Sequence, residues 1–263
     1  MSDFTSLDLS VVDGVATITL NRPEAANSID VTMSAELLKA SLAVASDPQV
    51  RVLILTGAGR LFSAGGDLAF MATLGDKIGE GLREVTANLH SALATLSHMN
   101  APVITAINGT AAGAGFSLAI TGDFVIASDR AKFTMAYTAA GLAPDGSSTY
   151  YLPRLVGIRR AKELMITNRL LNAAEALEWG LINEVVPADE LMTRANALAA
   201  QLATGATCAF GEVKRMLHAS FQNGLETQMQ METNAIANMS RTADGQEGVA
   251  AFLGKRKPEF KGC

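Results

Sequence analysis

Two short glycine-rich segments have the residue types for chemistry that uses the backbone itself. Residues 62–68 read FSAGGDL and residues 108–116 read NGTAAGAGF, and each follows an apolar run typical of a buried strand. Small residues let a backbone approach a ligand closely, and the first N–H groups of a helix are free and partly positive. Facing each other, the segments could direct two N–H donors at one oxyanion. Alternatively, the glycines only make tight turns and allow close helix packing.

A carboxylate in a third segment could carry protons. Asp145 lies in LAPDGSS, residues 142–148. An aspartate followed by small polar residues ahead of a helix is typical of a helix N-cap. A carboxylate over the face of a bound substrate can also remove and return protons. The local sequence leaves both roles open.

Other catalytic and cofactor patterns fail. Residues 57–62 (GAGRLF) begin like a dinucleotide-binding fingerprint, but the sixth position is Phe62. Ser117 lies in GFSLA, which lacks the second glycine of a nucleophile elbow. The three histidines, His90, His98 and His218, have no metal-ligand spacing. We therefore expect no metal and no permanently bound cofactor.

These segments need a scaffold of buried strands and helices. Residues 7–12 and 15–20 predict a hairpin around Asp13-Gly14. Apolar runs predict buried strands, and helical spacing predicts helices between them and throughout the chain after about residue 160. The strands are predicted at residues 50–56, 103–107 and 124–127, and the first helices at residues 33–44 and 79–97. The repetition favours an α/β fold of stacked strand-and-helix turns over a closed barrel.

The composition excludes several classes of function. The chain has 263 residues and a net charge of −5, which gives no electrostatic footprint for nucleic acid. Its start has no basic, apolar leader, and no apolar run is long enough to span a membrane. Cys208 and Cys263 form no disulfide framework, which fits a reducing compartment. We expect a cytoplasmic protein without nucleic-acid or membrane partners.

The order of motifs along the chain resembles the crotonase (enoyl-CoA hydratase/isomerase) family. The matching segments span nearly the whole chain and are residues 21–23, 55–68, 102–120, 141–157, 174–182 and 247–256. The resemblance implies a crotonase-like spiral of ββα turns followed by a helical C-terminal trimerisation region. We accordingly predict a spiral domain with the active site over residues 1–195 and a helical oligomerisation region over residues 196–263. A homotrimer, or a hexamer made of two trimers, is implied.

The resemblance also implies the parts of the site. The backbone N–H groups of Gly66 and Ala114 would bind a thioester oxygen, with a coenzyme A thioester as the substrate. The residues implied along the coenzyme A are Ala25, Ala26, Phe62, Ser63, Ala64, Phe252 and Lys255. The residues proposed for the acyl pocket or an auxiliary role are Tyr137, His90, Phe116, Leu142, Phe70 and Met71.

The residues at the acid–base positions favour isomerisation. The two glutamates of the family's hydratases match Ser117 and Tyr137 here, and neither is a carboxylate. Some isomerases of the family carry their only acid at the Pro-Asp-Gly position that Asp145 matches. One carboxylate above a dienolate can remove a proton from C2 and return one to C4. We therefore predict a Δ3-Δ2-enoyl-CoA isomerase-like enzyme that uses Asp145.

Three alternatives remain. The chain could be a hydratase, or a non-catalytic acyl-CoA binding protein, although Asp145 argues against the latter. It could also resemble the aryl-CoA dehalogenases of the family, with Asp145 as nucleophile, His90 as the histidine and Tyr137 as the aromatic donor. That donor is an indole in the dehalogenases, and Gly66 stands where they have a bulky aromatic residue. We expect Tyr137 to shape the acyl pocket, and His90 to be a helix residue near it.

Overall fold

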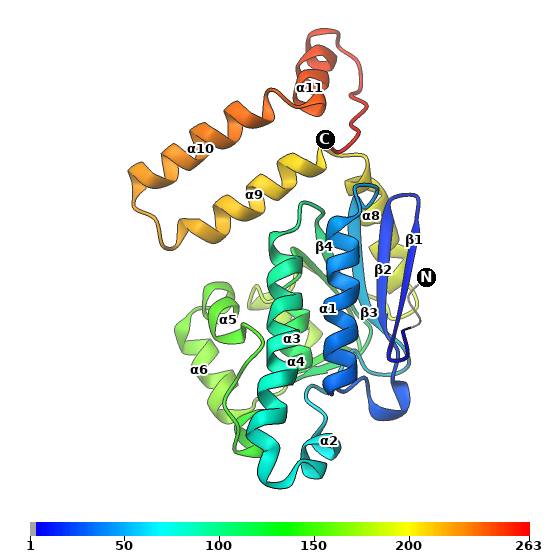
Figure 1. Ribbon diagram of the computed structural model, residues 1–263, viewed down its shortest axis with the longest axis vertical. Coiled ribbons are helices and arrows are strands. Elements are labelled where there is room, and N and C mark those ends of the chain that lie inside the picture. The colour runs from blue at the N-terminus through cyan, green and yellow to red at the C-terminus, as the bar shows by residue number, and fades with distance from the viewer. Residues whose placement is uncertain (1–3) are drawn as a thin grey trace.

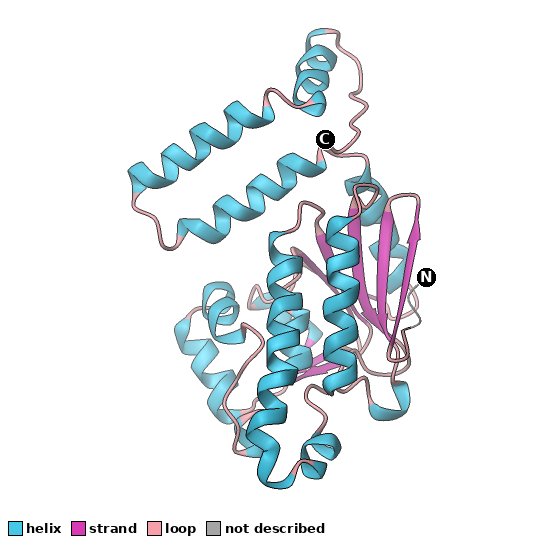
Figure 2. Ribbon diagram, in the orientation of Figure 1, coloured by secondary structure: helices cyan, strands magenta, loops and turns pink. Residues whose placement is uncertain are grey.

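A six-stranded sheet forms the centre of the computed structural model, which describes residues 4–263 (Figures 1 and 2). The first two strands pair antiparallel and the others pair parallel. In spatial order the strands are β1 (Leu7–Val12), β2 (Val15–Leu20), β3 (Val52–Gly57), β4 (Val103–Ile107), β6 (Phe124–Ser128) and β9 (Glu184–Val186).

The predicted hairpin and central strands are confirmed. Val12 pairs with Val15, and the turn residues Asp13 and Gly14 have φ of 49° and 77°, as a two-residue hairpin turn with right-handed strand twist requires. All five residues of β4 are buried, which explains its unbroken apolar run.

A second, three-stranded sheet shows how the chain spirals. It consists of β5 (Thr110–Ala112), β7 (Lys132–Thr134) and β8 (Leu171–Asn172). Because β5 follows β4 and β7 follows β6, consecutive turns of the chain add one strand to each sheet. The structure is thus a spiral of turns and not a closed barrel, as predicted. Strands of two or three residues were not predicted, because they are too short to show a period.

Helices cover both faces of the larger sheet. α1 (Val31–Ser46) and α3 (Ile78–His98) lie side by side on one face, and α8 (Leu191–Ala203) packs against β3, β4 and β6. The carboxylate of Asp30 caps the first turn of α1 by accepting a hydrogen bond from the N–H of Met33. The helix buries the predicted apolar face, which is Met33, Leu37, Ala40 and Val44.

The chain ends in a helical arm that extends from the rest of the molecule (Figure 1). The arm comprises α9 (Thr207–Ser220), α10 (Leu225–Met239) and α11 (Ala243–Leu253). Lys214 of α9 is buried and anchors the arm, with its Nζ 2.8 Å from the Asp123 carboxylate. The expected boundary between residues 195 and 196 falls inside α8. The division into two domains stays a prediction. None of the helices within residues 4–263 is long and apolar enough to cross a membrane.

Candidate active site

The two glycine-rich segments meet in space, as the sequence suggested they could. Gly65 has φ of 94°, and a Cβ at this position would lie 2.6 Å from the carbonyl oxygen of Ala112 and 3.0 Å from the nitrogen of Ala114. Ser63 and Ala111 form a parallel bridge beside this contact. Only glycine combines that φ with so close an approach.

Two backbone N–H groups are left free where the segments meet. Ala114 is the first residue of α4 (Ala114–Ala119), after Gly113 with φ of 51°, and the first N–H groups of a helix have no partner within the helix. Within residues 4–263, the N–H groups of Gly66 and Ala114 donate no hydrogen bond. Both residues line one cavity. This is the arrangement that an oxyanion hole requires, and the binding role of the two groups stays a prediction.

That cavity has a volume of about 300 Å³ and a mainly apolar wall. Asp145 is the only carboxylate among its described lining residues. One side of the wall is a face of α3 whose residues recur at helical spacing: Leu82, Val85, Thr86 and Leu89. This face was not predicted to line the pocket, although its helical period is visible in the sequence.

Asp145 is not a helix cap, so the N-cap interpretation was wrong. Helix α5 (Ser148–Val156) begins after Ser147, which has φ of 65°, and the Asp145 side chain caps no N–H. The carbonyl oxygen of Asp145 accepts hydrogen bonds from the N–H and hydroxyl of Ser148 instead. The carboxylate is therefore free to face the cavity, where its Oδ1 accepts a 2.5 Å hydrogen bond from the hydroxyl of Tyr137.

Tyr137 and Ser117 form a network behind this carboxylate. The single hydroxyl proton of Tyr137 goes to Asp145, and the hydroxyl of the buried Ser117 lies 3.0 Å both from the Tyr137 hydroxyl and from the Asp145 carbonyl oxygen. Burial, followed by the charge of Asp145, raises the pKa of Tyr137, so the phenol keeps its proton. Tyr137 lines the cavity, and its expected contact with an acyl group stays a prediction. Its hydrogen bond to Asp145 was not expected.

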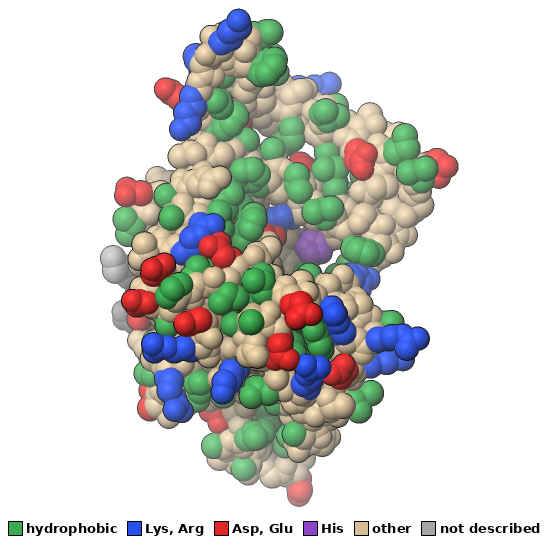
Figure 3. Space-filling model, turned by 180° about the vertical axis from the view of Figure 1, so that it is seen from behind, with side chains coloured by type: hydrophobic (Ala, Val, Ile, Leu, Met, Phe, Trp, Pro, Cys, Tyr) green, Lys and Arg blue, Asp and Glu red, His purple; other side chains and the backbone are tan. Residues whose placement is uncertain are grey.

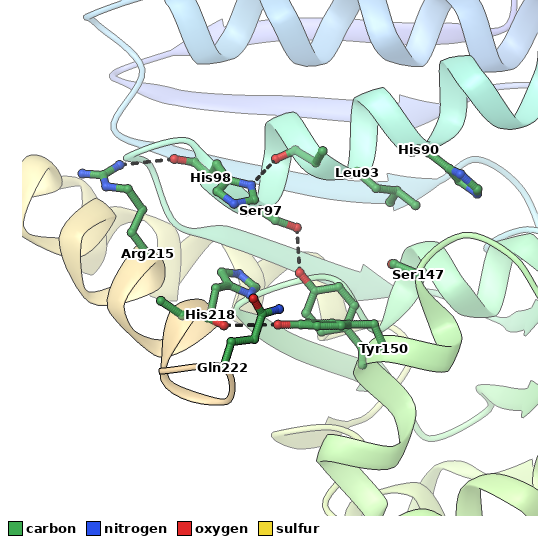
Figure 4. Close-up of a pocket in the computed structure, with 12 residues that line it drawn as sticks. His90, Leu93, Ser97, His98, Ser147, Tyr150, Arg215, His218 and Gln222 are labelled. Carbon is green, nitrogen blue, oxygen red and sulfur yellow. Dashed lines mark hydrogen bonds between the residues drawn. The ribbon is translucent and has the colours of Figure 1, made fainter. Parts of the chain in front are cut away.

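His90 approaches the same carboxylate from α3. Its Nε2 accepts a 3.1 Å hydrogen bond from the N–H of Gly146 and lies 4.0 Å from Oδ2 of Asp145. A ring nitrogen that accepts carries no proton, so the neutral ring has its proton on Nδ1, and the contact with Asp145 is not an ion pair in this state. The side chain of His90 is half exposed and does not line the acyl cavity. It lines a second cavity, shown in Figure 4.

Of the other residues expected at the acyl pocket, Leu142 and Met71 line the cavity, whereas Phe70 and Phe116 do not. Phe116 is fully buried and packs edge-to-face on Phe133, with ring centroids 6.1 Å apart. Helix α2 (Leu68–Thr73) directs Leu68 and Met71, three residues apart, into the cavity. Phe70 is not on that face and packs against the core.

The segments expected along the coenzyme A lie together, but not all are accessible. The N–H of Ala64 donates a 2.9 Å hydrogen bond to the carbonyl oxygen of Ala26, next to Ala25. Ala64 is exposed, and Ala25 and Ala26 are partly so. Phe62 and Ser63 are fully buried and offer a ligand no surface. These two residues support the loop and are not direct contacts.

Charged residues hold this loop against α2. Arg22 bridges the carboxylates of Asp30 at 2.9 Å and Asp67 at 3.2 Å. Burial opposes the ionisation of Asp67, but hydrogen bonds from the N–H of Phe70 and from Ser28, together with the charge of Arg22, outweigh it and lower the pKa of Asp67. The Asp67 carboxylate also caps α2.

Phe252 and Lys255 lie outside the site of their own chain. Phe252 belongs to α11 and Lys255 follows it, and α11 lies at the opposite end of the molecule from α2 (Figure 1). Their expected contact with coenzyme A would therefore require a second copy of the chain, and it stays a prediction.

Comparison with known proteins agrees with this geometry. The family model described as "Enoyl-CoA hydratase/isomerase" matches residues 11–263. The chain is 42% identical over 254 residues to the 1,2-epoxyphenylacetyl-CoA isomerase of Escherichia coli (strain K12), covering 96% of this chain and 97% of that protein. It is 39% identical over 259 residues to a probable enoyl-CoA hydratase of Rhodobacter capsulatus, covering 98% and 99%.

A solved structure extends the likeness to the fold. The crystal structure of a putative enoyl-CoA hydratase/isomerase from Mycobacterium abscessus has a TM-score of 0.91 and 39% identity, covering 97% of this chain and 98% of the other. With a match to the family model over nearly its full length and a common fold, this chain is an enzyme of the enoyl-CoA hydratase/isomerase family, within the crotonase superfamily.

Proposed function

We propose that this enzyme moves the double bond of an enoyl-CoA thioester from C3–C4 to C2–C3, with Asp145 as its only acid and base. One observation carries the proposal. The cavity that holds the free N–H groups of Gly66 and Ala114 has a single carboxylate among its described lining residues. An oxyanion site and one proton carrier are sufficient for this reaction.

The geometry supports a two-step proton transfer. With the thioester oxygen at the N–H groups of Gly66 and Ala114, the Asp145 carboxylate takes a proton from C2, and the electron pair moves through the carbonyl to the thioester oxygen. The two N–H groups stabilise the resulting dienolate. Protonated Asp145 then returns a proton to C4. The C3–C4 electron pair forms the new C–H bond, the C1–C2 pair forms the C2–C3 double bond, and the oxygen pair re-forms the carbonyl.

The hydrogen bond from Tyr137 makes the two oxygens of Asp145 inequivalent. The tyrosine hydroxyl occupies Oδ1, which leaves Oδ2 to carry the proton. Because the phenol keeps its proton, this hydrogen bond holds the carboxylate in one orientation before substrate arrives.

The wall of the cavity defines the acyl group. It is largely aliphatic, with Thr86, Tyr137 and Asp145 as its polar side chains. A charged acyl group would lose its hydration there without a counter-ion. The substrate is therefore a thioester with an uncharged and mainly hydrocarbon acyl group, and its coenzyme A portion lies along Ala25, Ala26 and Ala64.

Hydration is the competing reaction, because Asp145 could also activate water. Among the described residues, the positions of the two hydratase glutamates offer no second base: Ser117 is buried, and the raised pKa of Tyr137 keeps that side chain protonated. Attack by Asp145 on an aryl-CoA halide, with release of halide, is less favoured because Tyr137 stands where the dehalogenases have an indole and Gly66 where they have a bulky aromatic residue.

A panel of thioesters distinguishes these reactions. The protein is incubated in D2O with 3-enoyl-, 2-enoyl- and 4-halobenzoyl-CoA, and products are identified by mass spectrometry. We expect 2-enoyl product from the 3-enoyl thioester with wild type, and loss of turnover but retained thioester binding with Asp145→Ala. The control is Asp76→Ala, because Asp76 is an exposed carboxylate outside the cavity.

Each other result contradicts the proposal in a specific way. Full turnover by Asp145→Ala would exclude this residue as the base. Hydration of the 2-enoyl thioester without isomerisation would make the enzyme a hydratase, and halide release would make it a dehalogenase. Binding without turnover of any thioester would favour a non-catalytic role.

We also propose that the arm assembles the chain into a homotrimer or a hexamer. Exposed large hydrophobic side chains follow one another along the arm, and such a surface is typical of an interface. They are Val213, Leu217, Phe221, Leu225, Met229, Ile236, Val249, Phe252 and Leu253. Figure 3 shows hydrophobic side chains distributed over this part of the surface. Light scattering on the purified protein would report three or six chains, and a monomer would contradict the proposal.

A further inference from the structure

A second cavity adjoins the acyl cavity and has no role in the reaction described above. It has a volume of about 630 Å³ and lies between α3, α5 and α9. Leu89 and Asp145 line the acyl cavity. His90, which follows Leu89, and Ser147, two residues after Asp145, line the second cavity. Figure 4 shows His90 and Ser147 at one end and His98 and His218 at the other, with the ring of Tyr150 between them. Its wall is also mainly apolar, but histidine, tyrosine, serine, arginine and glutamine side chains interrupt it and give water polar partners.

His90 stands between this cavity and the working oxygen of Asp145. Oδ1 of Asp145 is occupied by the Tyr137 hydroxyl, and Nε2 of His90 lies 4.0 Å from Oδ2. Nε2 accepts its hydrogen bond from the backbone N–H of Gly146 and not from another side chain. A movement of about 1 Å would bring Nε2 within hydrogen-bond distance of Oδ2.

A hydrogen bond between His90 and Asp145 would matter because the acyl cavity is apolar. An acyl group that fills the cavity displaces water from it, so Asp145 loses its direct contact with solvent on that side. His90, in contrast, remains half exposed and faces the second cavity. It is the polar side chain placed to link the carboxyl group with water while substrate is bound.

We propose that His90 relays protons between Asp145 and water in the second cavity, so that the proton taken from C2 exchanges with solvent before one is returned to C4. This inference rests on the proposed isomerase function. His90 acts through Asp145 and contacts no reacting atom, so it is a positioning residue for the proton and not a catalytic one.

The exchange conserves protons and charge. Protonated Asp145 gives its proton to Nε2 of His90, which releases the N–H of Gly146, and the products are a carboxylate and an imidazolium. The half-exposed imidazolium then loses this Nε2 proton to water of the second cavity, and Nε2 takes a different proton from that water. Transfer of the new proton from Nε2 to Oδ2 restores protonated Asp145, so the net change is the replacement of one hydrogen, and no oxidant or other reactant is needed.

The test compares isotope exchange with turnover. Isomerisation of a 3-enoyl-CoA is followed in D2O at early times, and the deuterium content at C4 of the 2-enoyl product is measured by mass spectrometry. His90→Gln keeps a side-chain oxygen that can accept from the N–H of Gly146, but it cannot relay a proton. We expect near-normal turnover with deuterium incorporation per turnover reduced on the order of tenfold.

Two controls separate the relay from a structural role. His98→Gln changes another histidine of the same cavity, one that stacks on His218 at 5.6 Å, and should leave both quantities unchanged. His90→Ala should lose exchange and regain it on addition of imidazole. Wild-type product without deuterium at C4 would overturn the relay. An unchanged ratio of exchange to turnover in His90→Gln would overturn it as well.

A saturated acyl-CoA keeps this test separate from the isomerase proposal. Asp145 should exchange the C2 hydrogens of butyryl-CoA with D2O through the enolate, whether or not a double bond can move. Exchange that depends on Asp145 and His90, in an enzyme that isomerises no 3-enoyl thioester, would refute the isomerase and retain the relay. Isomerisation with exchange independent of His90 would do the opposite.

Discussion

The two sides of the acyl cavity present different kinds of group, backbone on one side and side chain on the other. On one side the donors are backbone N–H groups, and their positions depend on the absence of side chains at Gly65 and Gly113. On the other side the proposed proton carrier is a side chain, that of Asp145, and its position depends on Tyr137 and Ser117. The backbone side suits any reaction that passes through a thioester enolate. The side-chain side determines which reaction follows, so it can change while the fold is kept.

Apart from the loss of Asp145 itself, the largest effect is expected on the backbone side, from Gly65→Ala. A Cβ at this position would meet the carbonyl oxygen of Ala112 at 2.6 Å and the nitrogen of Ala114 at 3.0 Å, at a φ of 94°. The methyl group should separate the two segments and displace at least one donor. We expect kcat/KM to fall roughly 100- to 1000-fold, the usual effect of losing one oxyanion donor.

A matched glycine controls for the strain of a positive φ. Gly75 has φ of 52°, and a Cβ there would meet no atom within 4 Å. Gly75→Ala should therefore place a side chain at a positive φ without the collision, and its kcat/KM should remain near the wild-type value. Equal losses in both variants, with equal loss of thermal stability, would mean that the close approach of Gly65 to Ala114 has no special role.

A smaller effect is expected on the side-chain side, from Tyr137→Phe. The change removes the donor to Oδ1 of Asp145 and keeps the ring that lines the cavity. A hydrogen bond to a charged group contributes about 1.5–3 kcal/mol, so kcat/KM should fall on the order of tenfold to a hundredfold.

The pH profile shows whether Tyr137 acts on the carboxylate. A donor favours the ionised form of its acceptor, so losing it should move the acidic limb of kcat/KM to higher pH. The titratable groups that face Asp145 are Tyr137 and His90, and His90 is unchanged in this variant. Tyr151→Phe is the control, because its hydroxyl contacts Ser97 and not Asp145. An unmoved acidic limb in Tyr137→Phe would limit the tyrosine to a packing role.

The fold was predictable where a repeating pattern had room to appear. Residues 103–107 form a strand with the predicted bounds, and α10 is one of the helices predicted after about residue 160, because each pattern is long enough to be read from the local sequence. The strands β5, β7 and β8 have two or three residues and are set by pairing with distant segments. Such contacts leave no local signal.

Part of the site was also predictable from the sequence, and part was not. The glycines of residues 62–68 and 108–116 indicated close backbone approach, and the structure shows it. The local sequence around Asp145 left a helix N-cap open as one of two roles, because Asp-Gly-Ser-Ser resembles a helix start. Left-handed backbone at Gly146 and Ser147 instead places the first turn of α5 after the aspartate. The contact of Tyr137 with Asp145 depends on that backbone path and had no motif of its own.

The smallest effect on this side is expected from Ser117→Ala. The Ser117 hydroxyl does not contact the carboxylate, but it lies 3.0 Å from the Tyr137 hydroxyl and 3.0 Å from the carbonyl oxygen of Asp145. Its loss should loosen both partners while the bond from Tyr137 to Oδ1 persists, so kcat/KM should fall only about two- to tenfold. In the Tyr137→Phe background the same change should have less effect, because the two hydroxyls act in one network. Fully additive losses in the double variant would show instead that Ser117 supports the loop through the carbonyl oxygen alone, and that the side-chain half of the site is two separate contacts.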